Sequence, residues 1–165
     1  RGESFGLKEP ISIISGTFGK AFGSGGAFLA TDKITGKNLI QNCGAFRYTT
    51  ALAPPLCASA LAALNLIKSN PSWGSELKEK AIAFRDRLSQ LGWQRPVGEG
   101  PIISIILGSD ELAIDCQKKL EAQGLLAVAI RPPTVPEGKS RLRLVIRRNT
   151  PDQAFERLIE VLKNK

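Results

Sequence analysis

The sequence predicts an α/β fold in two parts, and three observations lead to this prediction. Of its 165 residues, 42% are hydrophobic and 23% are charged, a balance typical of globular proteins that bury a core. Up to about residue 70, short apolar runs flank a glycine-rich turn and precede helix-like segments. Beyond that point, amphipathic helices alternate with short strands. We therefore expect the tail of an α/β domain over residues 1–70 and a small α+β domain with its linking helix over residues 71–165.

The first part is built around a glycine-rich turn. Five glycines fall within the eleven residues from Gly16 to Gly26, which predicts a tight turn rather than a strand or helix. The Ala/Leu-rich segment after Pro54 is apolar on nearly every side, so we expect its helix, like the first strand, to be buried. The predicted elements are a strand over Ile11–Ser15, the turn, a strand over Ala27–Thr31, a helix from Asp32 as N-cap to about Asn42, and a helix over 54–69.

The second part carries clear start and stop signals. Asn70-Pro71-Ser72 interrupts the helical pattern, after which apolar residues return at three-to-four spacing. Thr150, Pro151 and Gln153 form the sequence pattern of a capping box. The predicted elements are a helix over 75–91, a strand over Pro101–Leu107, a helix over 109–123 capped by Ser109, strands over Leu125–Ile130 and Arg141–Arg147, and a final helix from Thr150.

The chain contains neither histidine nor methionine, and the missing histidine excludes several kinds of site. Without histidine, the chain cannot form a Ser/His/Asp triad, a Cys/His dyad or a histidine-ligated zinc site. The three cysteines match neither a metal-ligand pattern nor a redox pair, so we expect reduced thiols and no metal. Without methionine, and with Arg1 first, we expect a fragment whose upstream part is missing. Because no apolar run approaches ~18 residues and no signal peptide is evident, we expect a cytoplasmic protein without a membrane partner.

The net charge of +8, from 23 Lys+Arg against 15 Asp+Glu, raises the question of a polyanionic partner. The aromatic residues show no regular interleaving with the basic ones, and the cations are scattered along the chain. We therefore expect no nucleic-acid partner. A basic polyanion-binding module stays as the alternative from a different functional class.

The glycine-rich turn carries Lys20. A phosphate-binding P-loop is excluded because Ile14 stands where its first glycine is required and Ala21 where a hydroxyl would hold magnesium. A dinucleotide fingerprint is excluded because Phe28 takes the place of its third glycine. A lysine that forms a Schiff base fits the pattern, since the small neighbours leave space for a flat ring and Thr17 offers a hydroxyl to a phosphate. The other interpretation is a surface lysine in a tight turn.

The segment Ser15-Gly-Thr-Phe-Gly-Lys-Ala-Phe-Gly-Ser-Gly-Gly-Ala27 resembles the cofactor lysine segment of the α-oxoamine synthases, fold-type I enzymes that use pyridoxal 5'-phosphate (PLP). In that pattern, Lys20 matches the lysine that carries PLP, and Thr17 matches the threonine that contacts the cofactor phosphate. The resemblance implies that the first part of the chain is the C-terminal part of a PLP-binding large domain. The second part would be the small C-terminal domain of such a transferase.

A second segment, Arg47-Tyr-Thr-Thr-Ala-Leu-Ala-Pro-Pro55, resembles the family's aromatic residue and paired hydroxyls ahead of an alanine-rich helix. The resemblance implies that Thr49 and Thr50 reach the cofactor phosphate of the partner subunit. It therefore also implies a homodimer with the active site at the interface. From the residues alone, two threonines ahead of a helix could instead serve as local caps.

The third segment runs from Ile130 to Leu144 and joins a proline-rich loop to a strand with alternating arginines. By that alternation, Arg141 and Arg143 share one face and could receive an anion bidentately, or they could form a solvated cationic face. The pattern Arg-Pro-Pro-Thr-Val-Pro-x-Gly-x-x-Arg-Leu-Arg-Leu is similar to that of the α-oxoamine synthase branch acting in biotin biosynthesis. The resemblance implies that Arg143 binds the amino-acid carboxylate, with Arg131 and Thr134 lining the substrate side.

Together these resemblances imply a PLP-dependent acyltransferase of the aminotransferase class I/II fold. It would condense L-alanine with pimeloyl-CoA or a pimeloyl carrier protein, release CO2 and give 8-amino-7-oxononanoate, with Lys20 as the catalytic base. The family's pyridine-pairing aspartate and ring-stacking histidine precede residue 1, so we expect the fragment alone to be inactive. Relatives of the glycine C-acetyltransferase or 5-aminolevulinate synthase type are the alternative within the family.

Overall fold

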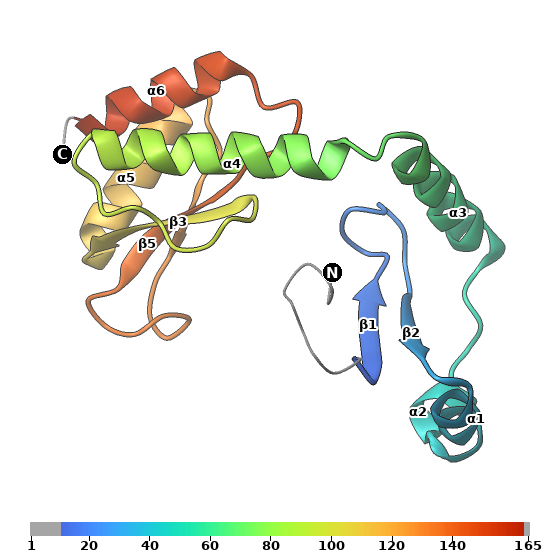
Figure 1. Ribbon diagram of the computed structural model, residues 1–165. Coiled ribbons are helices and arrows are strands. Elements are labelled where there is room, and N and C mark those ends of the chain that lie inside the picture. Colours follow the sequence, from blue (N-terminus) through green and yellow to red (C-terminus); the bar gives the residue numbers. More distant parts are fainter. Residues whose placement is uncertain (1–10, 164–165) are drawn as a thin grey trace. The chain divides into compact units, whose positions relative to one another are not determined.

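The computed structural model describes residues 11–163, and the chain divides between Pro71 and Ser72 into two compact units. Figure 1 shows the elements of each unit, coloured along the sequence. Among residues 11–163, no helix combines the length and the apolar character needed to cross a membrane.

The first unit contains one antiparallel pair of strands and three helices. The strands pair from Ile13 opposite Thr31 to Thr17 opposite Ala27, so the glycine-rich turn closes a β-hairpin. Asp32 caps the first helix as predicted, since its carboxylate accepts from the amides of Ile34 and Thr35 at 2.8 and 2.9 Å. The elements are β1 (Ile13–Thr17), β2 (Ala27–Thr31), α1 (Lys33–Asn42), α2 (Gly44–Arg47), which the sequence did not predict, and α3 (Pro54–Ser69).

The described part of the first unit, residues 11–71, contains no buried residue. Ile13 and Leu61 are 47% and 59% exposed, although both lie in the segments expected to be buried. The expectation of a buried strand and a buried 54–69 helix is therefore wrong. The physical reason is that two strands and three short helices are too few to cover both faces of the hairpin and all sides of an apolar helix.

The second unit is a three-stranded antiparallel sheet covered by helices on one face. The strand order is β3-β5-β4, so the strand that carries the arginine pair lies in the centre. Figure 1 shows α4, α5 and α6 around this sheet. The elements are α4 (Trp73–Gln90), β3 (Ile102–Gly108), α5 (Asp110–Ala122), β4 (Val128–Ile130), β5 (Ser140–Val145) and α6 (Asp152–Lys163).

One hydrophobic core holds this unit together. It takes alternate residues of the sheet, such as Ile103 and Leu142, and packs them against the apolar stripes of all three helices, including Leu88 and Leu120. These four side chains are fully buried. Because every second residue of each strand points into this core, the remaining residues face away from the helices.

Two predicted boundaries in this unit are wrong. The strand expected over Leu125–Ile130 is shorter, because its pairing with β5 begins only at Val128. The capping box at Thr150 does not form, because the Thr150 hydroxyl accepts from the amide of Arg147 at 2.9 Å and α6 begins at Asp152. Ser109, in contrast, caps α5 as predicted, since its hydroxyl accepts from the Leu112 amide.

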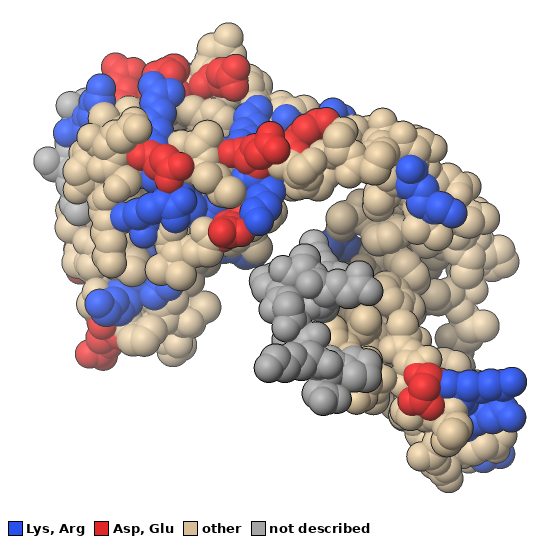
Figure 2. All heavy atoms as spheres, viewed as in Figure 1, with Lys and Arg blue, Asp and Glu red and all other residues tan. Residues whose placement is uncertain are grey.

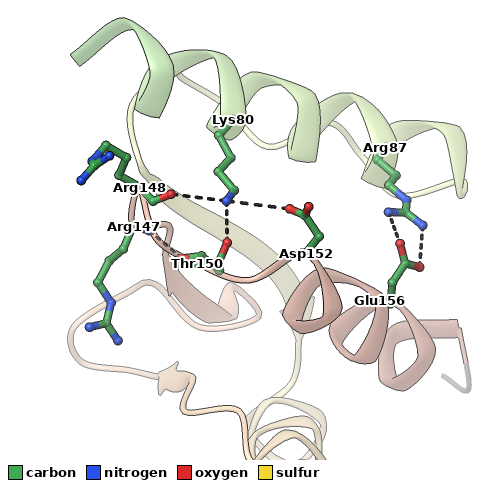
Figure 3. A network of polar contacts seen from close by, with 7 residues as sticks. All are labelled: Lys80, Arg87, Arg147, Arg148, Thr150, Asp152 and Glu156. Carbon is green, nitrogen blue, oxygen red and sulfur yellow. Dashed lines mark hydrogen bonds and ion pairs between the residues drawn. The ribbon is translucent and has the colours of Figure 1, made fainter. Parts of the chain in front are cut away.

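Polar contacts link α4 to α6 and to the turn before it (Figure 3). The Lys80 ammonium donates to the carbonyl of Thr150 at 2.5 Å and to that of Arg148 at 3.4 Å. About two turns further along α4, the Arg87 guanidinium binds both carboxylate oxygens of Glu156 at 2.6 and 2.7 Å. These contacts fix α6 and the turn before it against α4.

Candidate functional site

Lys20 lies in the turn of the first unit's hairpin. The amide of Phe18 donates to the Gly26 carbonyl, and that of Ser24 donates to the Phe18 carbonyl, each at 2.9 Å. The Lys20 carbonyl accepts from the Gly23 amide, also at 2.9 Å, so the lysine's own backbone is fixed. Its side chain is exposed and forms neither a hydrogen bond nor an ion pair with residues 11–163. The backbone is thus ordered around an amine that has no partner within that range.

Thr17 lies beneath the same turn. Its hydroxyl accepts from the Gly19 amide at 3.2 Å and donates to the Gly26 carbonyl at 3.3 Å. The ring of Phe18 contacts those of Phe22 and Phe28, with centroids 5.1 and 5.6 Å away. Thr17 and Lys20 are therefore held in one small structure, as the sequence pattern requires.

Two glycines join this turn to the segment before α3. A methyl group on Gly26 would collide with the Leu52 side chain, and one on Gly25 would lie 3.1 Å from Leu56 Cδ1. The Ser24 hydroxyl also donates to the Leu56 carbonyl at 2.6 Å. The sequence reasoning missed these contacts, although the Gly25-Gly26 pair was a signal for close approach of another segment.

Thr49 and Thr50 directly precede this segment. Both are exposed, and neither is a helix cap, because Tyr48 ends α2 and Ala53 is the N-cap of α3. The interpretation as local caps is therefore wrong. Within the described range, the two hydroxyls stay available to a ligand.

The second unit carries its arginine pair on the face of the sheet away from the helices. Arg143 lies in the central strand, opposite Ser104 of β3 and Val128 of β4. Arg141 is its neighbour on the same face, as predicted, but its Nε donates to the Lys139 carbonyl at 3.0 Å. Arg143 is exposed, and no carboxylate among residues 11–163 pairs with it. Of the two, Arg143 is the one whose guanidinium is fully available to an anion.

Arg131 and Thr134 lie on the loop over residues 131–139, between β4 and β5. The Thr134 amide donates to the Arg131 carbonyl at 3.0 Å, which closes a tight turn around the cis Pro132–Pro133 bond. Both side chains are exposed. The predicted residues thus divide between the units, with Lys20, Thr17, Thr49 and Thr50 in the first and Arg131, Thr134 and Arg143 in the second.

Charged side chains of both signs share the second unit's surface. On the face drawn in Figure 2, its basic and acidic groups are interspersed. Three ion pairs, Lys78–Glu99, Arg95–Asp86 and Lys119–Asp115, account for some of them. This mixture lacks the one-signed surface that a polyanion-binding module would show on that face.

Comparison with known proteins adds independent information. The family model for aminotransferase class I and II matches residues 3–162. A candidate 8-amino-7-oxononanoate synthase of Acetivibrio thermocellus is 40% identical over 162 residues, 98% of this chain and 41% of that protein. The 8-amino-7-oxononanoate synthase of Lysinibacillus sphaericus is 35% identical over 159 residues, 96% of this chain and 41% of that protein. The chain thus spans about two fifths of the length of these curated relatives.

The chain also superposes on parts of solved structures. The 8-amino-7-oxononanoate synthase of Francisella tularensis superposes with a TM-score of 0.81 at 26% identity, over 93% of this chain and 45% of that chain. The serine palmitoyltransferase of Sphingomonas wittichii superposes with a TM-score of 0.82 at 22% identity, over 93% of this chain and 39% of that chain. The second likeness is one of fold alone.

Proposed function

The chain belongs to the aminotransferase class I and II family, and from this premise we propose that it supplies the lysine and carboxylate-binding parts of a PLP-dependent α-oxoamine synthase. The proposed reaction condenses L-alanine with a pimeloyl thioester, releases the thiol carrier and CO2, and yields 8-amino-7-oxononanoate. The names of the relatives at 35 and 40% identity support this choice over the glycine-using branches. The observation that carries the proposal is the Lys20 amine, which has no partner among residues 11–163, in its ordered glycine turn.

The residues around Lys20 fit PLP. A methyl group added to Gly23 would have no atom of residues 11–163 within 4 Å, so nothing in that range crowds this side of the lysine turn. Thr17 places its hydroxyl beneath the turn, and Thr49 and Thr50 have hydroxyls that no helix end uses. When bound, PLP supplies an electron sink for the negative charge that develops on the amino acid's Cα.

Each proposed residue then has a defined task. The Lys20 amine would hold the cofactor, and as a free amine it would remove the Cα proton of the amino acid. Thr17 contacts the phosphate, and Thr49 and Thr50 donate to it across a homodimer interface. Arg143 holds the alanine carboxylate, for which a guanidinium that pairs with no carboxylate of residues 11–163 is the suitable donor. Arg131 and Thr134 line the substrate side.

We also propose how the units correspond to domains. The first unit would be the C-terminal part of a PLP-binding large domain, and the second would be the small domain of the same enzyme. The exposed apolar side chains of residues 11–71 support the first assignment, because such surfaces belong against other protein in a complete, cytoplasmic homodimer. A fragment without the protein that covers those surfaces would be inactive.

The decisive experiment uses the complete protein, incubated with PLP and reduced with borohydride. The wild type should yield a peptide with the cofactor fixed to Lys20, and Lys20→Ala should yield none. Lys37→Ala, an exposed lysine on α1, is the control that should behave as the wild type. A trapped active-site adduct in Lys20→Ala would refute the assignment.

A second test concerns the amino-acid substrate. Loss of a charge-assisted carboxylate contact in Arg143→Ala should lower kcat/KM for L-alanine about 10- to 150-fold, whereas Arg147→Ala should leave it unchanged. Comparing L-alanine with glycine, each with pimeloyl-CoA, separates the proposed branch from the alternative. Faster turnover with glycine would overturn the choice of alanine.

A further inference from the structure

Two side chains of α5 bind the two ends of the 131–139 loop. Before the loop, the Ala129 amide donates to Gln117 Oε1 at 2.7 Å. After the loop, the Ser140 hydroxyl donates to Asp110 Oδ1 at 2.5 Å. Between these points, the loop contains two short backbone turns, closed by the Thr134 and Lys139 amides. The loop that carries Arg131 and Thr134 is thus fastened on both sides by one helix.

The helix is well suited to fix a distance. Asp110 and Gln117 are seven residues apart, which is about two helical turns or ~10 Å, so they lie on the same side of α5. Between and beyond them, Ala113 and Leu120 are fully buried in the core. Because this core anchors α5 to the sheet, the two contacts hold the loop ends at a set separation.

Both contacts satisfy groups that would otherwise lack a partner. β4 is an edge strand, and its Ala129 amide faces outward, where Gln117 replaces the missing neighbouring strand. The Gln117 amide is itself oriented, since its Nε2 donates to Glu121 Oε1 at 3.0 Å. Ser140 is fully buried, so its hydroxyl needs an acceptor, and Asp110 provides it.

We propose that Asp110 and Gln117 are positioning residues, which hold the 131–139 loop so that Arg131 and Thr134 meet the substrate in one geometry. This inference rests on the proposed function. Neither residue touches the reacting atoms; Gln117 acts through the Ala129 amide on one side of the loop, and Asp110 acts through the Ser140 hydroxyl on the other. The sequence gives no local sign of this role, because the partners lie 30 and 12 residues away.

The test compares Asp110→Ala, Asp110→Asn and Glu111→Ala in the complete protein. Asparagine retains an oxygen that can accept from Ser140. Glu111→Ala removes the same charge from the same helical turn, and the Glu111 side chain is exposed with no partner among residues 11–163. A purely electrostatic effect on the helix would therefore appear equally in Glu111→Ala.

The first measurement is hydrogen exchange of a peptide covering the loop, without substrate. We expect about tenfold faster exchange in Asp110→Ala, and wild-type exchange in Asp110→Asn and Glu111→Ala, where a factor of ten corresponds to ~1.4 kcal/mol. Gln117→Met should accelerate the same peptide. Unchanged exchange in both Asp110→Ala and Gln117→Met would overturn the inference.

The second measurement is kcat/KM with L-alanine and pimeloyl-CoA. A loop displaced by about 1 Å should lower it about 100-fold in Asp110→Ala, with recovery in Asp110→Asn. Faster loop exchange with unchanged kcat/KM would overturn the positioning role. Borohydride trapping at Lys20 in the same samples distinguishes this failure from a failure of the proposed function, because trapping does not depend on the loop.

Discussion

A buried arginine provides the sharpest test of the second unit's packing. Arg85 of α4 has no exposed surface, yet it has no carboxylate partner among the described residues. Its Nη2 donates to the Ile102 carbonyl at 2.9 Å and its Nη1 to the Ala81 carbonyl at 3.1 Å, while its Nε has no acceptor within the described chain. Burial lowers the pKa of the Arg85 guanidinium, Arg95 lowers it further, and Glu99 opposes them.

These contacts predict different results for two substitutions. In Arg85→Ala, loss of the packed stem is expected to cost about 2–5 kcal/mol, and the orphaned Ile102 carbonyl adds about 1–3 kcal/mol. Removing a buried charge without an ionic partner offsets several kcal/mol of this. We therefore expect Arg85→Ala to destabilise the unit by about 2–4 kcal/mol. Arg85→Met keeps most of the stem, so we expect a change within about 1 kcal/mol.

Native-state hydrogen exchange of the complete protein measures these changes directly, because the amides of α4 and β3 report the free energy of opening of this unit. Leu88→Ala, in the same helix and fully buried, is a control that should cost about 2–5 kcal/mol by loss of packing alone. If Arg85→Met destabilised the unit as much as Arg85→Ala, the charge itself would be stabilising. The reasoning from packing would then be refuted.

Two further substitutions test the hairpin turn and the α4–α6 contact. Gly26→Ala should destabilise the hairpin, because φ is +92° and the new methyl would collide with Leu52. Gly74→Ala is the control: its methyl meets no atom of the described residues within 4 Å, and it should stabilise its helix by up to ~1 kcal/mol. Thermal unfolding checks both, and equal losses would contradict this account. The hydrogen bond from Arg87 lowers the pKa of Glu156 below its ordinary 4.5, so its stabilisation is present above that pH and lost as the pH falls through the lowered value. Glu156→Gln should therefore lower the unfolding midpoint at about pH 7 and lower it less and less as the pH falls below 4.5, and a loss that stays constant with pH would count against the ion pair.

The sequence pattern correctly predicted those features that depend only on residues close together in the chain, such as helix caps and strand faces. Asp32 and Ser109 cap their helices because a side chain and an amide two or three residues away suffice. The shared face of Arg141 and Arg143 follows from strand alternation in the same way. Thr150 shows the limit of such patterns. Its hydroxyl could cap α6 or accept a hydrogen bond within the preceding turn, and in the structure it accepts from the Arg147 amide of that turn.

Contacts between distant residues could not be predicted. Arg85 meets the Ile102 carbonyl only because α4 packs on β3, and Asp110 meets Ser140 only once the sheet has formed. The prediction that α3 is buried was wrong for a related reason. The apolar pattern of α3 indicates a surface that should pack against other protein, but it does not indicate which residues pack there. The role of Lys20 remains a prediction that rests on its turn and on family resemblance.

Because buried and exposed residues alternate along β5, the register that fills the core also sets the direction in which Arg143 points. Leu142 and Leu144 are buried, while Arg143 between them faces away from the helices. Slipping the strand by one residue would exchange these roles, driving a guanidinium into the core. A shift of β5 caused by a single-residue insertion or deletion in the 131–139 loop would cost the free energy of burying Arg143. We therefore expect the loop to change its conformation and β5 to keep its register. Length variation here should therefore change the shape of the loop and leave the direction of Arg143 intact.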